Sequence, residues 1–437
     1  MRRIVKLSVM IVLVGALAWA AQAAVKTPAN RSTAPRTAPE GAAKAKAVLS
    51  DDVLAKADLA YYWKFRLDLD RGERIERVWR IDELMYCLTN QRKLIAVDAR
   101  RGLPAWAQII GTKETIFEPV HADGVTLRPK RAGMKEMLQP RTLPPVEPYN
   151  ATFINTLSSV TVVNRSNGKL VKVFPLTYSS NAGGETDGTY FYGASTAGNY
   201  YGVRMDAEVN SWEMSTGDMI NTPTRLVEGV VLVGSQDKTL TAAVGAAQRK
   251  RKWIRVFDAP ITAPFHADRR GIFLGTQNGR IHVIDRSNGE RMKVLDEQTK
   301  AFKDWGPIIT KGEILDPIQV GQSTIFQYVR KDAFYAIGID TVKPRWTNPD
   351  GRMVAAIFEG TVALLDKNKV LLMVNELSGK INVSLPMTGW DMIVPNTQID
   401  AIFAASADGT VCCIRRKGAP ALTEKMLNPN PVPGEKK

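Results

Sequence analysis

Short runs of alternating apolar and polar residues, separated by turn residues, recur along most of this chain. The segment 261–295 shows the pattern in full, with strands expected at 261–266, 272–275, 280–284 and 290–295. Asn278-Gly279 lies between two of these runs and accepts the positive φ that tight hairpin turns require. The pattern therefore predicts four short antiparallel strands joined by tight turns.

The same pattern returns at a nearly fixed interval. In each copy an apolar strand ends at one turn residue, and these residues occupy positions 98, 164, 204, 245, 285, 338, 375 and 415. The steps between them are 66, 40, 41, 40, 53, 37 and 40 residues. A period near forty residues with four strands in each repeat is typical of a β-propeller. We predict an all-β, eight-bladed β-propeller of four-stranded antiparallel blades over residues 51–420.

The eighth copy ends without a fourth strand. The segment 61–69 is rich in aromatic and apolar residues and precedes the first blade. We predict that it supplies the outer strand of blade eight, because this closure leaves no open edge in the ring. Five tryptophans are interpreted as blade-packing residues, because their large indoles can cover the gap between neighbouring blades. They are Trp63, Trp106, Trp212, Trp253 and Trp346.

The two ends of the chain differ in composition from the repeats. Residues 1–23 begin with arginines, continue with an apolar run and end with small residues, which predicts a secretory signal peptide. An uncleaved membrane anchor is the alternative. Residues 24–50 are rich in Ala, Pro and Lys and predict a disordered linker, and residues 421–437 a disordered tail. We expect an exported protein of the periplasm or cell envelope.

The net charge of +15 arises from 59 basic and 44 acidic side chains. A basic exported protein can meet an anionic surface or an acidic protein face. Aromatic residues do not interleave with the basic ones, so nucleic acid is not expected as a partner.

Two of the three cysteines, Cys412 and Cys413, are adjacent in the third strand of the last blade. Neighbours on a strand point to opposite faces, so a disulfide between them would be strained. They are either two small buried residues or a redox pair. A link from Cys87 in blade one to either of them is a further alternative.

Segments 86–102 and 275–289 resemble pyrroloquinoline-quinone (PQQ) type propeller repeats, which combine a polar turn, an apolar strand end with Asp, and a Gly turn. Two kinds of protein share such repeats: quinoprotein dehydrogenases and non-enzymatic propellers that resemble the assembly factor BamB and bind proteins. The dehydrogenases have a vicinal disulfide early in the chain, calcium ligands and an Asp base. Cys412-Cys413 instead lies within a late repeat strand, and no residues match the ligands or the base. The resemblance therefore implies a non-enzymatic propeller without a PQQ and calcium cofactor.

Few residues suggest chemistry of another kind. His121 and His266 occur in equivalent Pro-x-His-Ala-Asp segments of blades two and five, which repeat ancestry explains. Neither a metal-binding spacing nor a catalytic set stands out. A polysaccharide-binding propeller is a second alternative, for which Trp305, Tyr149 and Trp390 would be the stacking residues.

The 66-residue step marks a long insertion in blade two, and long loops on a rigid scaffold often carry function. Its basic residues form the candidate interaction loop: Arg128, Lys130, Arg131, Lys135 and Arg141. A smaller insertion covers 297–313. We predict a non-catalytic exported scaffold that mediates protein–protein interaction in the cell envelope, with a PQQ-dependent dehydrogenase or a polysaccharide binder as the alternatives.

Overall fold

The computed structural model describes residues 49–111, 113–128, 146–246, 249–295 and 299–428. All of them belong to the second of two compact units, Lys46–Lys437. The predicted signal peptide, nearly all of the predicted linker and the last nine residues of the chain lie outside the described residues.

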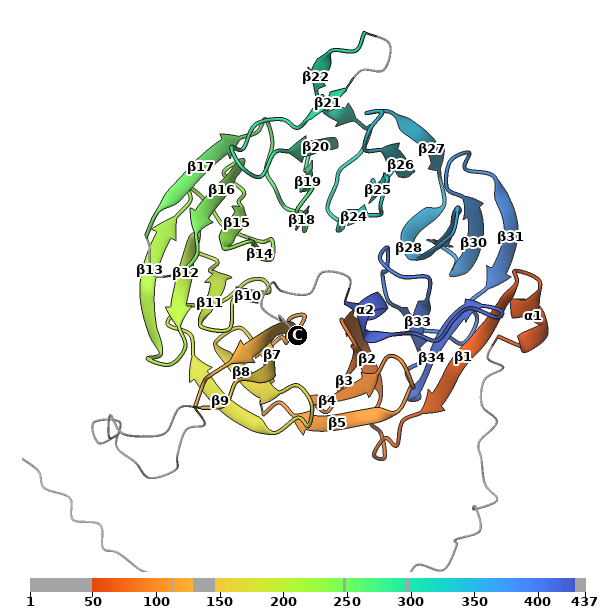
Figure 1. The fold of residues 1–437 in the computed structure, drawn as a ribbon, viewed down its shortest axis with the longest axis horizontal. Helices are drawn as coiled ribbons and strands as arrows, with labels where there is room; N and C mark the ends of the chain where they lie inside the picture. The colour runs from red at the N-terminus through yellow and green to blue at the C-terminus, as the bar shows by residue number, and fades with distance from the viewer. Residues whose placement is uncertain (1–48, 112, 129–145, 247–248, 296–298, 429–437) are drawn as a thin grey trace, which may run out of the picture. The chain divides into compact units, whose positions relative to one another are not determined.

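The described residues form a ring of eight four-stranded antiparallel sheets (Figure 1). The strand that begins each repeat is the innermost strand of its sheet. Blades one to four consist of β2–β5 (Ile75–Ile81, Leu84–Thr89, Lys93–Asp98, Pro104–Ile109), β6–β9 (Val120–Val125, Tyr149–Asn155, Ser159–Asn164, Leu170–Pro175), β10–β13 (Glu185–Thr186, Tyr190–Ala194, Asn199–Arg204, Val209–Ser215) and β14–β17 (Arg225–Val227, Val230–Gly234, Thr239–Val244, Arg251–Val256). Blades five to eight consist of β18, β19, β20 and β23 (His266–Asp268, Gly271–Thr276, Arg280–Ile284, Ile308–Ile309), β24–β27 (Gln319–Val320, Thr324–Tyr328, Phe334–Gly338, Pro344–Asn348), β28–β31 (Gly351–Phe358, Thr361–Asp366, Val370–Asn375, Ile381–Pro386) and β32, β33, β34 and β1 (Met392–Ile393, Ile402–Ala405, Thr410–Arg416, Leu59–Arg66). The predicted eight-bladed propeller is confirmed.

The first strand of the chain closes the ring. β1 pairs antiparallel with β34, from Leu59 opposite Arg416 to Arg66 opposite Thr410. The pairing joins the two ends of the repeat region within one sheet, so blade eight has its full set of four strands. The closure predicted from the missing fourth strand of the last repeat is confirmed.

An indole at one position of the outer strand links most blades to the next blade. Trp63 in β1 donates its Nε1–H to the carbonyl oxygen of Ala99 at 2.8 Å, and Trp106 in β5 donates to Arg165 at 2.8 Å. Trp212, Trp253 and Trp346 make the equivalent bond from blades three, four and six. Gly102 faces Trp63 with a φ of 73°, and a Cβ there would lie 2.4 Å from the ring. Glycine is therefore required where the indole covers the turn of the next blade.

Two blades make this link with residues that the pattern did not identify. In blade two Lys172 occupies the tryptophan position, donates to the carbonyl oxygen of Met205 at 2.9 Å and pairs with Glu208 at 2.9 Å. In blade five Trp305 comes from the smaller insertion and donates to the carbonyl oxygen of Ile339 at 3.0 Å. An aliphatic stem with a polar tip performs the same task as an indole here, because both combine apolar contact with one donor.

Blade five differs from its predicted strands. The inner strand is β18 rather than 261–266, and the outer strand is β23 rather than 290–295. Residues Lys293–Leu295 (β21) instead pair with Phe302–Asp304 (β22) in a separate hairpin. The hairpin projects from the outside of the ring (Figure 1). The insertion explains the difference, because Trp305 packs against blade six before the chain returns to β20 through β23.

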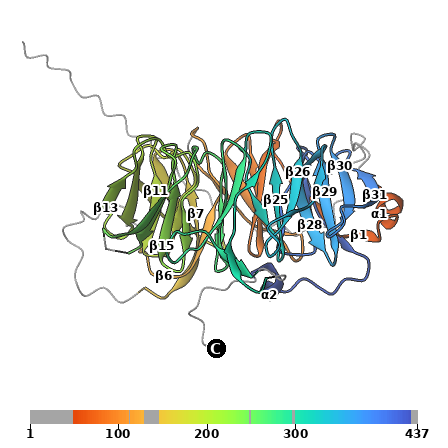
Figure 2. The same ribbon diagram turned by 90° about the horizontal axis from the view of Figure 1, so that it is seen from above.

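Two short helices flank the repeats: α1 (Asp51–Ala55) before β1 and α2 (Glu424–Leu427) after β34. Figure 2 shows α2 at one face of the ring. Leu422 and Leu427 are buried in the apolar cluster between blades eight and one, so packing continues beyond the expected end of the propeller at 420. Among the described residues, no helix is long and apolar enough to cross a membrane.

The buried side chain of His282 is expected to make the folding stability of the ring depend on pH. It lies buried on β20 against Phe257, and its Nε2 has no hydrogen-bond partner among the residues that the structure describes. Burial, helped by the nearby Arg291, lowers its pKa from 6.5 to about 4. Between these two pH values the unfolded chain binds more protons at this site, so folding stability falls as the pH decreases. A shift of this size corresponds to about 3 kcal/mol.

Urea unfolding at pH 7 and at pH 4.5 tests this contribution. We expect the unfolding free energy to fall less between these two pH values for His282→Leu than for the unaltered chain. An equal loss in both proteins would contradict this prediction.

Candidate functional site

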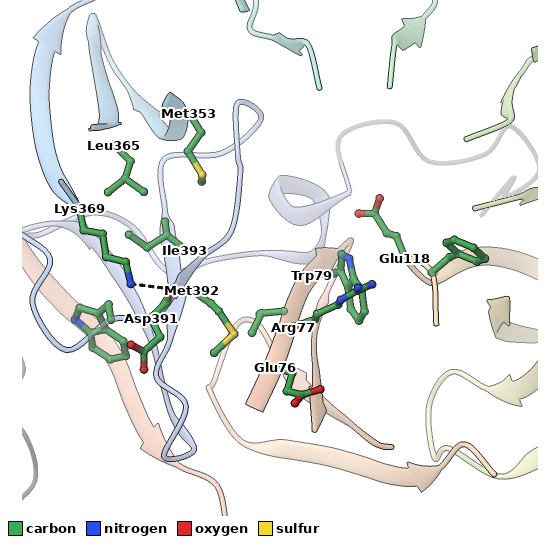
Figure 3. Close-up of a pocket in the computed structure, with 13 residues that line it drawn as sticks. Glu76, Arg77, Trp79, Glu118, Met353, Leu365, Lys369, Asp391, Met392 and Ile393 are labelled. Carbon is green, nitrogen blue, oxygen red and sulfur yellow. Dashed lines mark hydrogen bonds between the residues drawn. The ribbon is translucent and has the colours of Figure 1, made fainter. Parts of the chain in front are cut away.

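The inner strands of blades one, seven and eight and the segment before β6 surround a pocket of about 460 Å³ (Figure 3). We call it the central pocket. Arg77 and Glu118 enter it from one side, and Lys369 and Asp391 from the other. Trp79, Met353, Met392 and Ile393 add apolar surface to its walls. This combination of apolar walls and a few charged groups is typical of a binding pocket.

Two carboxyl groups of the inner part of the ring, those of Glu185 and Glu118, interact with the same arginine. Glu185 in β10 pairs with Arg225 in β14 at 3.3 Å. Burial raises the pKa of Glu185, although Arg225 opposes the shift. Desolvation by the neighbouring protein atoms also raises the pKa of Glu118, and Arg225 again opposes the shift. Arg225 therefore forms an ion pair with Glu185 and also acts electrostatically on Glu118.

A second pocket, of about 550 Å³, lies where the inner strands of blades two to five end and turn toward the second strands. These turns lie at the opposite end of the inner strands from the central pocket. Most of its charged side chains are acidic, but cations bind them: Arg165 pairs with Asp123, Arg286 with Glu228, and Arg270 with Asp268. We call it the acidic pocket. The pairs of Asp123 and Asp268 lie within blades two and five, whereas the Arg286–Glu228 pair joins blade five to blade four.

Asp82, Glu83 and His121 bring three potential metal-ligand atoms within 4.8 Å of one another. Both imidazole nitrogens are already engaged, Nδ1 with Asp82 at 2.8 Å and Nε2 with the hydroxyl of Tyr86 at 2.7 Å. Glu83 pairs with Arg165 at 3.0 Å. Burial would raise the pKa of Asp82, but contact with His121 keeps it below its usual value. The cluster is best explained as a polar link between blades one and two.

The sequence pattern did not identify this cluster. The repeat aligns His121 in β6 with Arg80 in β2, and Asp82 follows Arg80 by two residues. A search for residues in equivalent positions of successive blades would have found the contact, because such residues are neighbours in a ring.

The three cysteines are free and fully buried. Cys412 packs in the apolar cluster between blades seven and eight, and Cys413 in the one between blades eight and one. Cys87 shares the second cluster. Burial raises the pKa of Cys87 to about 12 and raises those of Cys412 and Cys413 as well. None of the three lines the central or the acidic pocket.

Of the candidate interaction loop, the structure describes only Arg128, at the end of the segment that leaves β6. Lys130, Arg131, Lys135 and Arg141 lie outside the described residues, in the connection from β6 to β7. The residues considered for sugar stacking are not suitably exposed. Trp305 and Trp390 are each 1% exposed, and Tyr149 is half-buried with its hydroxyl donating to Leu127.

The smaller insertion instead exposes two apolar residues that the sequence reasoning missed. Leu295 and Phe302 are cross-strand neighbours on the β21–β22 hairpin, with 48% and 73% of their surface exposed. Val294, on the opposite face of the hairpin, is buried against the ring. The alternation along β21 would have indicated an exposed face only if the hairpin itself had been predicted. We call this pair the hairpin knob.

The ring, its four-stranded blades and their closure define an eight-bladed β-propeller. Residues 203–294 match the family model described as outer membrane protein assembly factor BamB. The crystal structure of BamB from Moraxella catarrhalis is similar, with a TM-score of 0.57 and 15% sequence identity over 83% of this chain and 99% of that chain. The resemblance stated from the repeats is confirmed.

The structural likeness extends well beyond that protein. The computationally designed Ika8 protein matches with a TM-score of 0.55 and 10% identity, covering 80% of this chain and 98% of its own. In all, 1473 chains of solved structures match. No curated protein gives a significant sequence match. At such low identities the likeness establishes the fold, and function must be argued from the sites.

The positions of the cysteines lead to a prediction about cofactor chemistry. Cys412 and Cys413 lie on opposite faces of a blade, so they do not form a cap over a planar quinone in either pocket. We expect a titration of the protein with pyrroloquinoline quinone and Ca²⁺ to give neither a saturable absorbance change nor dye-linked alcohol oxidation. Stoichiometric binding with turnover would contradict this expectation.

Proposed function

We propose that this chain is a non-catalytic scaffold of the cell envelope, which binds another protein through elements carried on the propeller ring. The hairpin knob is the observation that carries the proposal. A phenylalanine with most of its surface exposed on a projecting hairpin is unfavourable in water unless a partner covers it. Large aromatic side chains of this kind often dominate the energy of protein interfaces.

The surroundings of the knob fit this role. Lys293 and Asp304 are paired across the same hairpin, so charged groups border the exposed apolar pair. An apolar centre with a polar rim is the usual anatomy of a protein interface. Trp305 follows directly after β22 and fixes the hairpin to blade six through its bond to Ile339. The knob is therefore presented on a fixed base, which lowers the entropic cost of binding.

The location in the envelope has two supports. The apolar run near the start of the sequence predicts export. The matching family model is described as an outer membrane protein assembly factor. A scaffold in that compartment would meet both membrane proteins and exported chains.

The test compares partner capture by the tagged protein and by matched variants in an envelope extract. We expect Leu295→Ser with Phe302→Ser to reduce retention of a defined partner by about 10-fold or more, as for a central interface residue. Leu377→Ser removes a side chain of comparable exposure, 68%, from blade seven and should leave capture unchanged. A third variant, with Arg128, Lys130 and Arg131 changed to Glu, measures the part played by the blade-two insertion.

Support requires one protein that is lost with the knob variant, kept with Leu377→Ser and bound directly after purification. If capture is equal in the knob variant and the unaltered protein, the knob is not the interface. If no protein binds the unaltered chain above background, the scaffold proposal itself fails.

A further inference from the structure

A third pocket, of about 600 Å³, lies beside the central pocket. Met353 lines both of them. Its other walls come from the start of blade six and from the turn between β25 and β26, at the same end of the ring as the central pocket. Tyr328, Arg330, Lys331 and Arg352 are among the polar residues that line it. We call it the basic pocket.

The cations of the basic pocket exceed its acids. Asp316 is the only carboxylate among the residues that line this pocket, and its Oδ2 lies 3.1 Å from Nε of Arg330. Within the described parts of the chain, no ion pair involves Lys331 or Arg352. Both side chains are exposed, so they keep their charge without an internal counter-ion. The pocket therefore presents two uncompensated positive groups.

The position of Arg352 is set before any ligand binds. The Arg352 guanidinium carbon lies 4.0 Å from the centre of the Tyr328 ring. Stacking of this kind uses the face of the guanidinium and leaves its N–H groups available at the edge. Gln319, beside them, is fixed to the backbone of Val354 by two hydrogen bonds of 2.8 and 2.9 Å. A planar anion such as a carboxylate matches the fork of donors that Arg352 offers.

The neighbouring central pocket narrows the choice of ligand. Its lining includes Glu76, Glu118 and Asp391 against Arg77 and Lys369. A uniform polyanion, such as an acidic polysaccharide, would be repelled by these carboxylates while it contacted the basic pocket. A polypeptide can place one acidic residue in the basic pocket and an apolar side chain beside Met353 and Trp79. The pair of pockets thus favours a short extended peptide of mixed character.

We propose that the basic pocket binds an acidic side chain of an extended segment of a partner polypeptide, with an adjacent apolar residue in the central pocket. This inference rests on the proposed function, because it assumes that the ring binds protein. It adds a second contact surface on the inner part of the ring, separate from the hairpin knob on the outside. It also states the chemistry of the segment that is bound.

The experiment measures fluorescence anisotropy with the full chain and a fluorescein-labelled peptide that carries two glutamates between leucines. A second probe carries glutamines in place of the glutamates. We expect the glutamate probe to bind about 10-fold more tightly, as charge-assisted hydrogen bonds to a carboxylate allow. Lys331→Gln with Arg352→Gln should remove most of this preference. Lys169→Gln with Lys380→Gln, which changes the net charge equally on turns at the other end of the blades, should preserve it.

Three outcomes would overturn the inference. The pocket variant could bind the glutamate probe as tightly as the unaltered protein does. The control variant could lose as much affinity as the pocket variant, which would show a general effect of net charge. Dextran sulfate could bind in a way that depends on Lys331 and Arg352 while the peptide does not, which would make a polyanion the ligand. Unchanged thermal unfolding of both variants excludes a folding defect.

The result also separates this inference from the proposed function. Partner capture through the hairpin knob without any peptide binding would reject the basic pocket and leave the scaffold role in place. Peptide binding that persists in the Leu295→Ser, Phe302→Ser variant would support an independent second surface.

Discussion

Deletion of residues 59–66 is expected to abolish the soluble, folded ring. These residues form β1, which pairs with β34 along its whole length and completes blade eight. Without them the N–H and C=O groups of β34 that face β1 lose their partners, and the sheet gains an open edge, a known cause of aggregation. Size-exclusion chromatography and circular dichroism of the truncated protein should show aggregated or unfolded material.

Point variants within β1 distinguish ring closure from a general effect of shortening the chain. Trp63→Ala removes the indole that covers Gly102 and bonds to Ala99, and we expect a loss of about 3–5 kcal/mol in unfolding free energy. Arg66→Ala changes an exposed residue of the same strand, whose ion pair with Asp408 spans 3.9 Å, and should cost less than about 1 kcal/mol. A truncated protein that stays monomeric, with native unfolding behaviour, would contradict the closure.

Arg415→Met is expected to produce the second large loss of stability. The Arg415 side chain is 1% exposed and makes two hydrogen bonds to the Asp400 carboxylate, at 2.8 and 2.9 Å. It also donates to the carbonyl oxygen of Pro420 and lies 5.3 Å from the centre of the Tyr62 ring. One side chain thus joins β34, the loop before β33, β1 and the segment after the last blade. Removing one partner of a fully buried pair typically costs about 3–5 kcal/mol. Because the Asp400 side chain is 34% exposed and water stabilises part of its charge, we expect a loss of about 2–3 kcal/mol.

A double-mutant cycle tests the cause of this loss. If the uncompensated carboxylate is responsible, Asp400→Asn should recover part of the stability in the Arg415→Met background while lowering it in the unaltered protein. Urea unfolding of the four proteins gives the coupling energy. Additive effects of the two substitutions would show that Arg415 acts through its other contacts.

The sequence predicted the architecture because the period of the repeat is a global property of the chain. The spacing identified eight blades, and the missing strand of the last repeat identified the role of 61–69, a segment whose strand the structure places at Leu59–Arg66. Local errors occurred where an insertion interrupts the period. In blade five the segment 290–295 has the composition of an outer strand, but the next residues provide a closer partner in β22. Strand composition alone does not select between two partners.

The sites were harder to predict, because they depend on which blades become neighbours. Lys172 replaces a tryptophan that the pattern leads one to expect, and only its contact with Met205 reveals the shared role. The basic pocket combines Tyr328 and Arg330 of blade six with Arg352 of blade seven. No motif connects these residues along the chain, and a turn and an inner strand bring them together only in the folded ring.

Site-specific photocrosslinking at position 302 tests the scaffold proposal most directly. A benzoylphenylalanine in place of Phe302 keeps the aromatic character of the hairpin knob and forms covalent bonds to whatever covers it in intact cells. We expect ultraviolet light to produce one discrete adduct with an envelope protein, absent when the same group replaces Leu377. Equal adducts at both positions, or none at position 302, would contradict the proposal that the hairpin knob is a protein interface.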